Sequence, residues 1–161
     1  FADEIHTPEC LDIDFGRKHR PYSGFHELAY LRRNHFDVNE SQLPSSLEAQ
    51  PDEYVLMRLC AWNTFHDIGN SGLDPDTLER VVAAITKKYK LFIQPEGGYL
   101  PDHLEKYRLA IPPEAYHDVL CHAAFIVTEG FTTASEAMIF GVPSVVINAI
   151  SCDTLRCQSR Q

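Results

Sequence analysis

Three stretches of the chain combine polar and small residues in arrangements suited to binding or catalysis. The first is EGFTTASE, in which Gly130 leaves out a Cβ where a ligand or the chain itself must come close. Thr132, Thr133 and Ser135 add hydroxyl donors around the N–H groups of a helix N-terminus, and a pyrophosphate would accept from both sets. Glu136, one turn further on, would accept hydrogen bonds from sugar hydroxyls. The stretch therefore suits a nucleotide-like ligand.

The same stretch of residues is also typical of an ordinary capped helix. Thr133 and Glu136 match the capping box S/T-x-x-E, in which the Glu reaches back to the Thr N–H. Capping boxes are frequent and phosphate sites are few, so the local spacing favours the cap. The stretch contains neither G-x-G-x-x-G nor G-x-x-x-x-G-K-[ST]. Both interpretations stay open at the level of spacing.

The second stretch, CAWNTFHDIGNSG, follows an apolar run and contains the neighbours His66 and Asp67. His66 would serve as a general acid or base in catalysis, with Asp67 as its partner. The alternative is a polar loop in which Asp67 only caps or orients His66. Arg58 is unusual inside the apolar run, and it would bind a phosphate or pair with a carboxylate.

The third stretch, QPEGGYLP, places Glu96 beside two glycines. Glu96 would meet a sugar hydroxyl, but a Gly-Gly turn explains the glycines and is the favoured interpretation. Eight histidines raise the question of a metal site, yet none belongs to H-E-x-x-H or to a Cys/His pair at zinc spacing. We therefore expect no metal site and no tightly bound cofactor.

Apolar runs predict the elements that position these stretches. Nearly continuous apolar runs are typical of strands that are buried on both faces. They occur at 54–60, 91–94, 123–128 and 144–148, with 107–111 as a weaker fifth candidate. Helices are predicted between them. Asp74 and Pro75 form an N-cap and first-turn pair, after which apolar residues recur at helical spacing, and Pro113 opens a second helix.

This alternation predicts an α/β fold, a Rossmann-like parallel sheet with helices on both faces, over residues 51–150. We expect residues 1–50 to be an N-terminal segment and linker, the remnant of a preceding domain, and residues 151–161 to be a tail. Ligands of such sheets bind beyond the carboxyl ends of the strands. The loops expected at that edge are 61–74, 95–100 and 129–133.

Composition narrows the class of protein. The 161 residues fit one domain, and the net charge of -9, from 14 basic and 23 acidic residues, argues against broad nucleic-acid binding. No apolar run approaches the ~20 residues of a membrane span, and the first residues show no secretory signal. Five cysteines without a C-x-x-C pair favour a reduced, cytoplasmic protein.

The sequence VTEGFTTASEAMIFGVPSVVIN resembles the donor-nucleotide motif in the C-terminal domain of GT-B glycosyltransferases and non-hydrolysing UDP-GlcNAc 2-epimerases. There a strand leads to a small-residue turn, a helix with a Glu follows, and Gly-x-Pro precedes the next strand. Phe131 stands where those families have a second glycine. The stretch YVLMRLCAWNTFHDIG, with GFHELAYL upstream, is similar to an uncharacterised prokaryotic family of predicted glycosyltransferases. The matching residues are Gly130, the turn 132–135, Glu136, Ala137, Gly141 and Pro143.

The resemblance implies one half of a GT-B type two-domain fold, with a UDP-sugar or similar nucleotide sugar as substrate. It implies that Thr132, Thr133 and Ser135 contact the diphosphate and that Glu136 contacts the ribose. Such enzymes place catalysis between two domains, so we expect this chain alone to be inactive or nearly so, and whether it is an enzyme by itself stays open. The alternative is a non-catalytic Rossmann-like domain that acts in protein association. An unfinished sheet would also favour a homo-oligomer.

Overall fold

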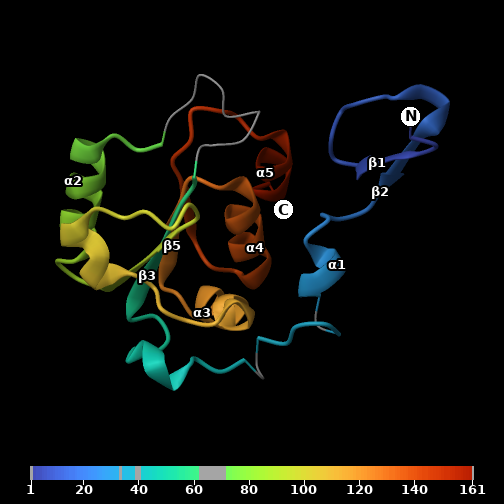
Figure 1. The fold of residues 1–161 in the computed structure, drawn as a ribbon. Helices are drawn as coiled ribbons and strands as arrows, with labels where there is room; N and C mark the ends of the chain where they lie inside the picture. Colours follow the sequence, from blue (N-terminus) through green and yellow to red (C-terminus); the bar gives the residue numbers. More distant parts are fainter. Residues whose placement is uncertain (1, 33, 39–40, 62–71, 161) are drawn as a thin grey trace.

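A computed structural model describes residues 2–32, 34–38, 41–61 and 72–160 of the chain (Figure 1). In the described part, the main sheet contains four parallel strands in the order β4-β3-β5-β6. The strands are β3 (Tyr54–Leu59), β4 (Lys90–Pro95), β5 (Phe125–Thr128) and β6 (Ser144–Val146). All four main predicted strands are thus present, which confirms the predicted parallel α/β fold.

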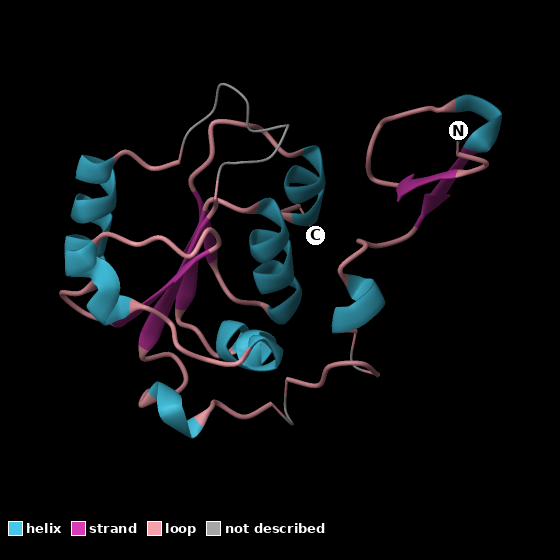
Figure 2. Ribbon diagram, in the orientation of Figure 1, coloured by secondary structure: helices cyan, strands magenta, loops and turns pink. Residues whose placement is uncertain are grey.

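Helices cover both faces of this sheet, as Figure 2 shows. One face carries α2 (Pro75–Ile85) and the 3₁₀ helix η4 (Asp102–Tyr107), and the other carries α3 (Tyr116–Cys121) and α4 (Phe131–Phe140). Successive side chains of a strand point to opposite faces, and β3 therefore supplies both cores. Tyr54 and Leu56 pack towards α3 and α4, while Val55 and Met57 pack towards α2 and η4. All four side chains are fully buried.

Helix α2 begins as the sequence predicts. The Asp74 carboxylate accepts a hydrogen bond of 3.0 Å from the Thr77 N–H, and Pro75 occupies the first helical position. The helix is held on the sheet by its apolar stripe, in which Leu78, Val82 and Ile85 are buried. Asp74 thereby fixes where α2 begins.

The order of the strands determines where a ligand can bind. From β3 the chain passes through α2 to β4 on one side, then returns through α3 to β5 on the other side of β3. Helix α4 then leads from β5 to β6 on the opposite face from α2. Connections therefore leave β3 and β5 in opposite directions, and a crevice forms beyond the carboxyl ends of such neighbours.

The predicted fifth strand at 107–111 is wrong. Tyr107 ends the 3₁₀ helix η4, and the segment makes only an isolated parallel bridge between Ile93 and Arg108. Pro112 and Pro113 follow closely, and proline has no N–H to donate to a strand ladder. A second short 3₁₀ helix, η5 (Pro113–Ala115), leads directly into α3.

The N-terminal segment lies beside the face of the domain that carries α4 and α5 (Figure 1). Tyr30 reaches Glu136 of α4, and the Cys157 thiol lies 3.1 Å from the Cys10 carbonyl oxygen. The segment contains a two-stranded parallel sheet that is separate from the main one. The remaining elements are β1 (Ile5–Pro8), η1 (Gly16–Lys18), β2 (His19–Tyr22), α1 (Leu28–Leu31), η2 (Ser45–Leu47) and α5 (Asp153–Gln158).

Candidate functional site

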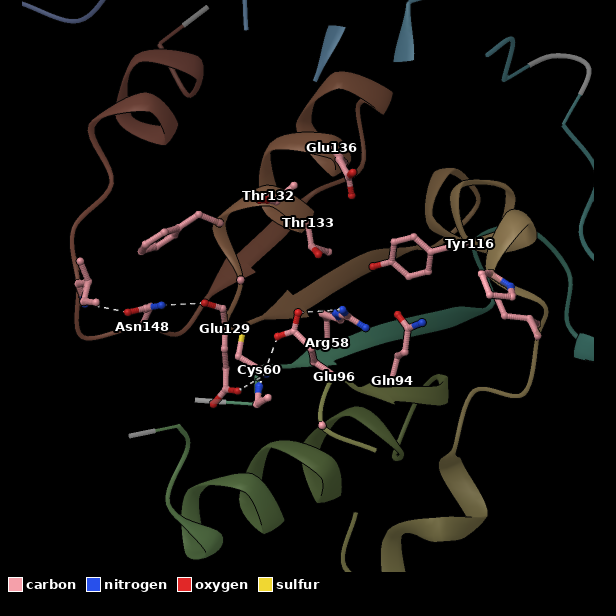
Figure 3. Close-up of a pocket in the computed structure, with 17 residues that line it drawn as sticks. Arg58, Cys60, Gln94, Glu96, Tyr116, Glu129, Thr132, Thr133, Glu136 and Asn148 are labelled. Atoms are coloured by element: carbon pink, nitrogen blue, oxygen red, sulfur yellow. Dashed lines mark hydrogen bonds and ion pairs between the residues drawn. The ribbon is translucent and has the colours of Figure 1, made fainter. Parts of the chain in front are cut away.

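A cavity of about 880 Å³ opens at the carboxyl ends of β3, β4 and β5. Figure 3 shows side chains from these three strand ends and from α4 around it. Residues from each of the three loops predicted at this edge contribute to the wall. Among the lining residues are Arg58, Cys60 and Ala61 at the end of β3, Gln94, Glu96 and Gly97 at β4, and Gly130, Phe131, Thr132, Thr133 and Glu136 at α4.

Helix α4 begins at the cavity. Gly130 is its N-cap and Phe131 its first residue. The Thr128 hydroxyl accepts a hydrogen bond of 2.9 Å from the Gly130 N–H, which fixes the turn into the helix. Thr133 thus lies inside the helix, and the capping box predicted from Thr133 to Glu136 is wrong. Gly130 has no side chain, so no N-cap side chain accepts from the first N–H groups of α4.

Glu136 is a buried carboxylate on the cavity wall, with 7% of its surface exposed. Its Oε1 accepts a hydrogen bond of 2.9 Å from the Tyr30 hydroxyl and lies 3.3 Å from His117 Nε2. These partners come from α1 and α3, so two other elements hold one oxygen of the carboxylate. Glu136 therefore does not serve its own helix as a cap.

Arg58 is the only Lys or Arg side chain among the described residues that line this cavity. Its Nη2 lies 3.5 Å from Glu96 Oε1, longer than the ~2.7–2.9 Å of a strong charge-assisted hydrogen bond (Figure 3). Half of the Glu96 side chain is exposed, so solvent screens the pair. An anionic ligand could therefore replace Glu96 as the partner of Arg58.

Glu129 connects the end of β3 with the start of α2. Its Oε2 accepts a hydrogen bond of 2.7 Å from the Cys60 N–H, and its Oε1 accepts one of 2.6 Å from the Leu73 N–H. The Asn148 amide in turn donates to the Glu129 carbonyl oxygen at 2.8 Å. Glu129 is only 3% exposed. This buried side chain thus holds together Cys60, just after β3, and Leu73, just before α2.

Two further polar side chains line the cavity beside Arg58 (Figure 3). The Gln94 Oε1 atom is buried without a hydrogen-bond partner among the described residues. Burial raises the pKa of Tyr116, although the neighbouring Thr133 hydroxyl and the positive charge of Arg58 lower it. Tyr116 therefore stays a neutral donor at physiological pH, while Gln94 offers an acceptor that a ligand could use.

The structure brings five of the six predicted ligand-binding residues to one cavity: Arg58, Gly130, Thr132, Thr133 and Glu136. Ser135 does not line it. One residue corresponds to ~100° around a helix, which turns Ser135 away from Glu136 and into the interior. Its carbonyl oxygen accepts from the Gln158 amide of α5 at 2.9 Å. The predicted catalytic pair, His66 and Asp67, lies outside the described residues.

Sequence reasoning missed Glu129, Tyr30 and His117 as partners in the site. A usable signal existed for Glu129, because a carboxylate that directly follows the apolar run AAFIVT must find donors where the strand ends. The other two offered no local signal. Tyr30 lies 106 positions from Glu136, and His117 lies 19 positions from it.

In the described ranges, no three His, Cys, Asp or Glu side chains are grouped as metal ligands would be. No helix there combines the length and apolarity that crossing a membrane requires. Comparison with protein-family models, with curated proteins and with solved structures finds no match to this chain.

Proposed function

We propose that the cavity binds a nucleotide sugar of the UDP-sugar class, and that the chain is the nucleotide-binding half of a GT-B type glycosyltransferase or epimerase-like enzyme. The observation that carries this proposal is the convergence of three features on one cavity: the start of α4, the guanidinium of Arg58 and the carboxylate of Glu136. The volume of about 880 Å³ lies in the range of small-molecule sites, which is roughly 300–1,000 Å³.

The diphosphate would lie at the start of α4. This helix has 10 residues, and its dipole and first N–H groups favour an anion at that end. The hydroxyls of Thr132 and Thr133 line the same wall, and Arg58 supplies a positive charge from β3. Phe131 also lines the wall, where the GT-B families that the sequence resembles have a second glycine.

The ribose would lie further along α4, beside Glu136. The carboxylate is one helical turn past Thr132 and shares the cavity with it. Carboxylates accept hydrogen bonds from vicinal hydroxyls without needing a donor of their own. The nucleotide would therefore run along the first two turns of α4.

His66 and Asp67 are proposed as the general acid or base of the reaction. They belong to the segment between Cys60 and Leu73, and both of those residues donate to Glu129. Glu129 in turn lines the cavity. Substituting His66 by Gln would test this role: in an enzyme that contains both domains, it should lower turnover without weakening nucleotide binding.

Titration of the protein with UDP in a calorimeter tests the proposal. Glu136→Ala should weaken UDP binding by at least about tenfold, because it removes the proposed hydrogen-bond acceptor of the ribose. Glu9→Ala is the matched control, because Glu9 is exposed and lies outside the cavity lining. If the unaltered protein fails to bind UDP and UDP-sugars at millimolar concentration, the proposal is wrong.

One observation favours the second candidate, a non-catalytic domain that acts in association. Among the described residues strand β6 lies at the edge of the sheet, and its Val145 and Val146 are 50% and 36% exposed. Edge strands with apolar side chains tend to pair with another chain, and a homo-oligomer would cover them. Sedimentation of the protein and of Val145→Lys compares the two candidates. Loss of an oligomer on substitution, with no nucleotide binding in either protein, would favour association.

A further inference from the structure

The two oxygens of the Glu136 carboxylate have different surroundings. Oε1 is bound by the Tyr30 hydroxyl at 2.9 Å and lies 3.3 Å from His117 Nε2. No hydrogen bond to Oε2 is found within the described residues. Because Glu136 lines the cavity, Oε2 is the oxygen that a ligand can reach. One oxygen is anchored and the other is available.

Tyr30 brings a donor from outside the sheet domain. It belongs to α1 in the N-terminal segment, which contacts α4. Burial raises the pKa of the Tyr30 phenol well above its usual value, and the hydrogen bond to Glu136 and the charge of Glu136 raise it further. The phenol therefore stays protonated and donates a hydrogen bond to Oε1 at every pH at which the protein would work.

His117 is held in place by rings on several sides. The ring of Tyr30 lies 5.9 Å from it, that of Phe36 lies 5.9 Å away and that of Phe140 lies 6.1 Å away. Phe36 and Phe140 meet it edge-on, which restricts rotation of the imidazole. Nε2 is thereby kept near Oε1, where it can serve as a second donor. The carboxylate is thus oriented from two directions.

We propose that Tyr30 and His117 are positioning residues, which orient Glu136 so that Oε2 accepts from the 2′ and 3′ hydroxyls of a ribonucleotide. This inference rests on the proposed function and makes it more specific. A carboxylate that is already oriented loses little freedom when a ligand binds, and the binding free energy improves by that amount. The N-terminal segment is then part of the nucleotide site, and the site prefers ribonucleotides to their deoxy analogues.

The test measures the dissociation constants of UDP and of 2′,3′-dideoxy-UDP for four proteins. These are the unaltered protein, Tyr30→Phe, His117→Phe and the control Tyr99→Phe. Tyr30→Phe keeps the ring but removes the donor, so UDP should bind about fivefold more weakly while the dideoxy analogue is unaffected. His117→Phe should behave in the same way. Tyr99 is 80% exposed and lies outside the cavity lining, so its variant should match the unaltered protein.

The pattern across the two ligands separates the alternatives. Equal weakening of both ligands in Tyr30→Phe would overturn the inference, because it would mean that Tyr30 only supports the fold. Unchanged binding of both ligands in Tyr30→Phe would overturn it as well. If the unaltered protein binds both ligands equally well, the phosphate part of the proposed function stands and the ribose part falls together with this inference. If it binds neither, the proposed function fails too.

Discussion

Glu129 Oε1 accepts a hydrogen bond of 2.6 Å from the Leu73 N–H, across 56 positions of the chain. The other oxygen of this buried carboxylate accepts from the Cys60 N–H. One side chain at the end of β5 therefore connects Cys60, just after β3, with Leu73, just before α2. Cys60 and Glu129 both line the cavity at which α4 begins.

Glu129→Ala should lower the free energy of unfolding by about 2–4 kcal/mol, because it leaves two backbone donors without their acceptor. Urea denaturation followed by circular dichroism would measure the change. Glu114→Ala provides the control, since Glu114 is exposed and its substitution should change the free energy by no more than about 0.5 kcal/mol. Equal stability of both variants would contradict the role assigned to Glu129.

Gly130→Ala should leave the fold intact. The φ angle of Gly130 is -90°, and an added Cβ would meet its nearest atom, Cys60 Sγ, at 3.5 Å, an ordinary van der Waals distance. We expect the free energy of unfolding to change by less than about 0.5 kcal/mol. Any loss of UDP affinity in this variant would then come from the methyl group at the start of α4. Unchanged affinity would mean that the phosphates do not approach Gly130.

Gly141→Ala should behave differently, although it lies at the other end of the same helix. The φ angle of Gly141 is +77°, and an added Cβ would meet no atom within 4 Å. The cost is therefore backbone strain alone, about 1–2 kcal/mol of unfolding free energy. Thermal unfolding of Gly130→Ala and Gly141→Ala, run side by side, would measure the contrast. A Gly141→Ala protein as stable as Gly130→Ala would contradict it.

The cap of α2 should make stability depend on pH in the acidic range. Hydrogen bonds from the Thr77 side chain and N–H lower the pKa of Asp74 below its usual value of 3.8. A lowered pKa stabilises the fold above the unfolded pKa, and this contribution disappears as the pH falls through the folded pKa. Asp74→Asn keeps a capping oxygen that does not titrate. The midpoint of thermal unfolding should therefore drop more for the unaltered protein than for the variant below pH 4. Parallel curves would exclude a contribution from Asp74.

Strand positions could be predicted because strands buried on both faces are apolar along their whole length. The run from Tyr54 to Met57 gives β3 correctly, since every side chain in it is fully buried. The strand predicted at 107–111 was wrong because Pro112 and Pro113 prevent the strand ladder from continuing beyond the single bridge at Arg108. An apolar composition alone does not distinguish a paired strand from an extended segment that touches the sheet at one residue.

The positions of the candidate residues at one edge of the sheet were predicted in part. The loop lengths and the strand order bring Arg58 and Thr132 to one edge, so their meeting follows from the fold class. The predicted capping box was wrong because the N-cap of the helix is Gly130, three residues before Thr133. The sequence alone is compatible with a helix that starts at either residue. The partners of Glu136 lie on distant parts of the chain, and local periodicity carries no information about such contacts.

The position of β3 between β4 and β5 has a consequence for hydrogen–deuterium exchange. Both edges of β3 are paired, whereas β6 is paired on one edge only within the described residues. Amide protons of β6 can exchange when the edge frays, but those of Val55 and Met57 become accessible only when the whole sheet opens. Their exchange rate therefore measures global unfolding. A ligand that binds only the folded protein would slow it in proportion to ligand concentration above the dissociation constant.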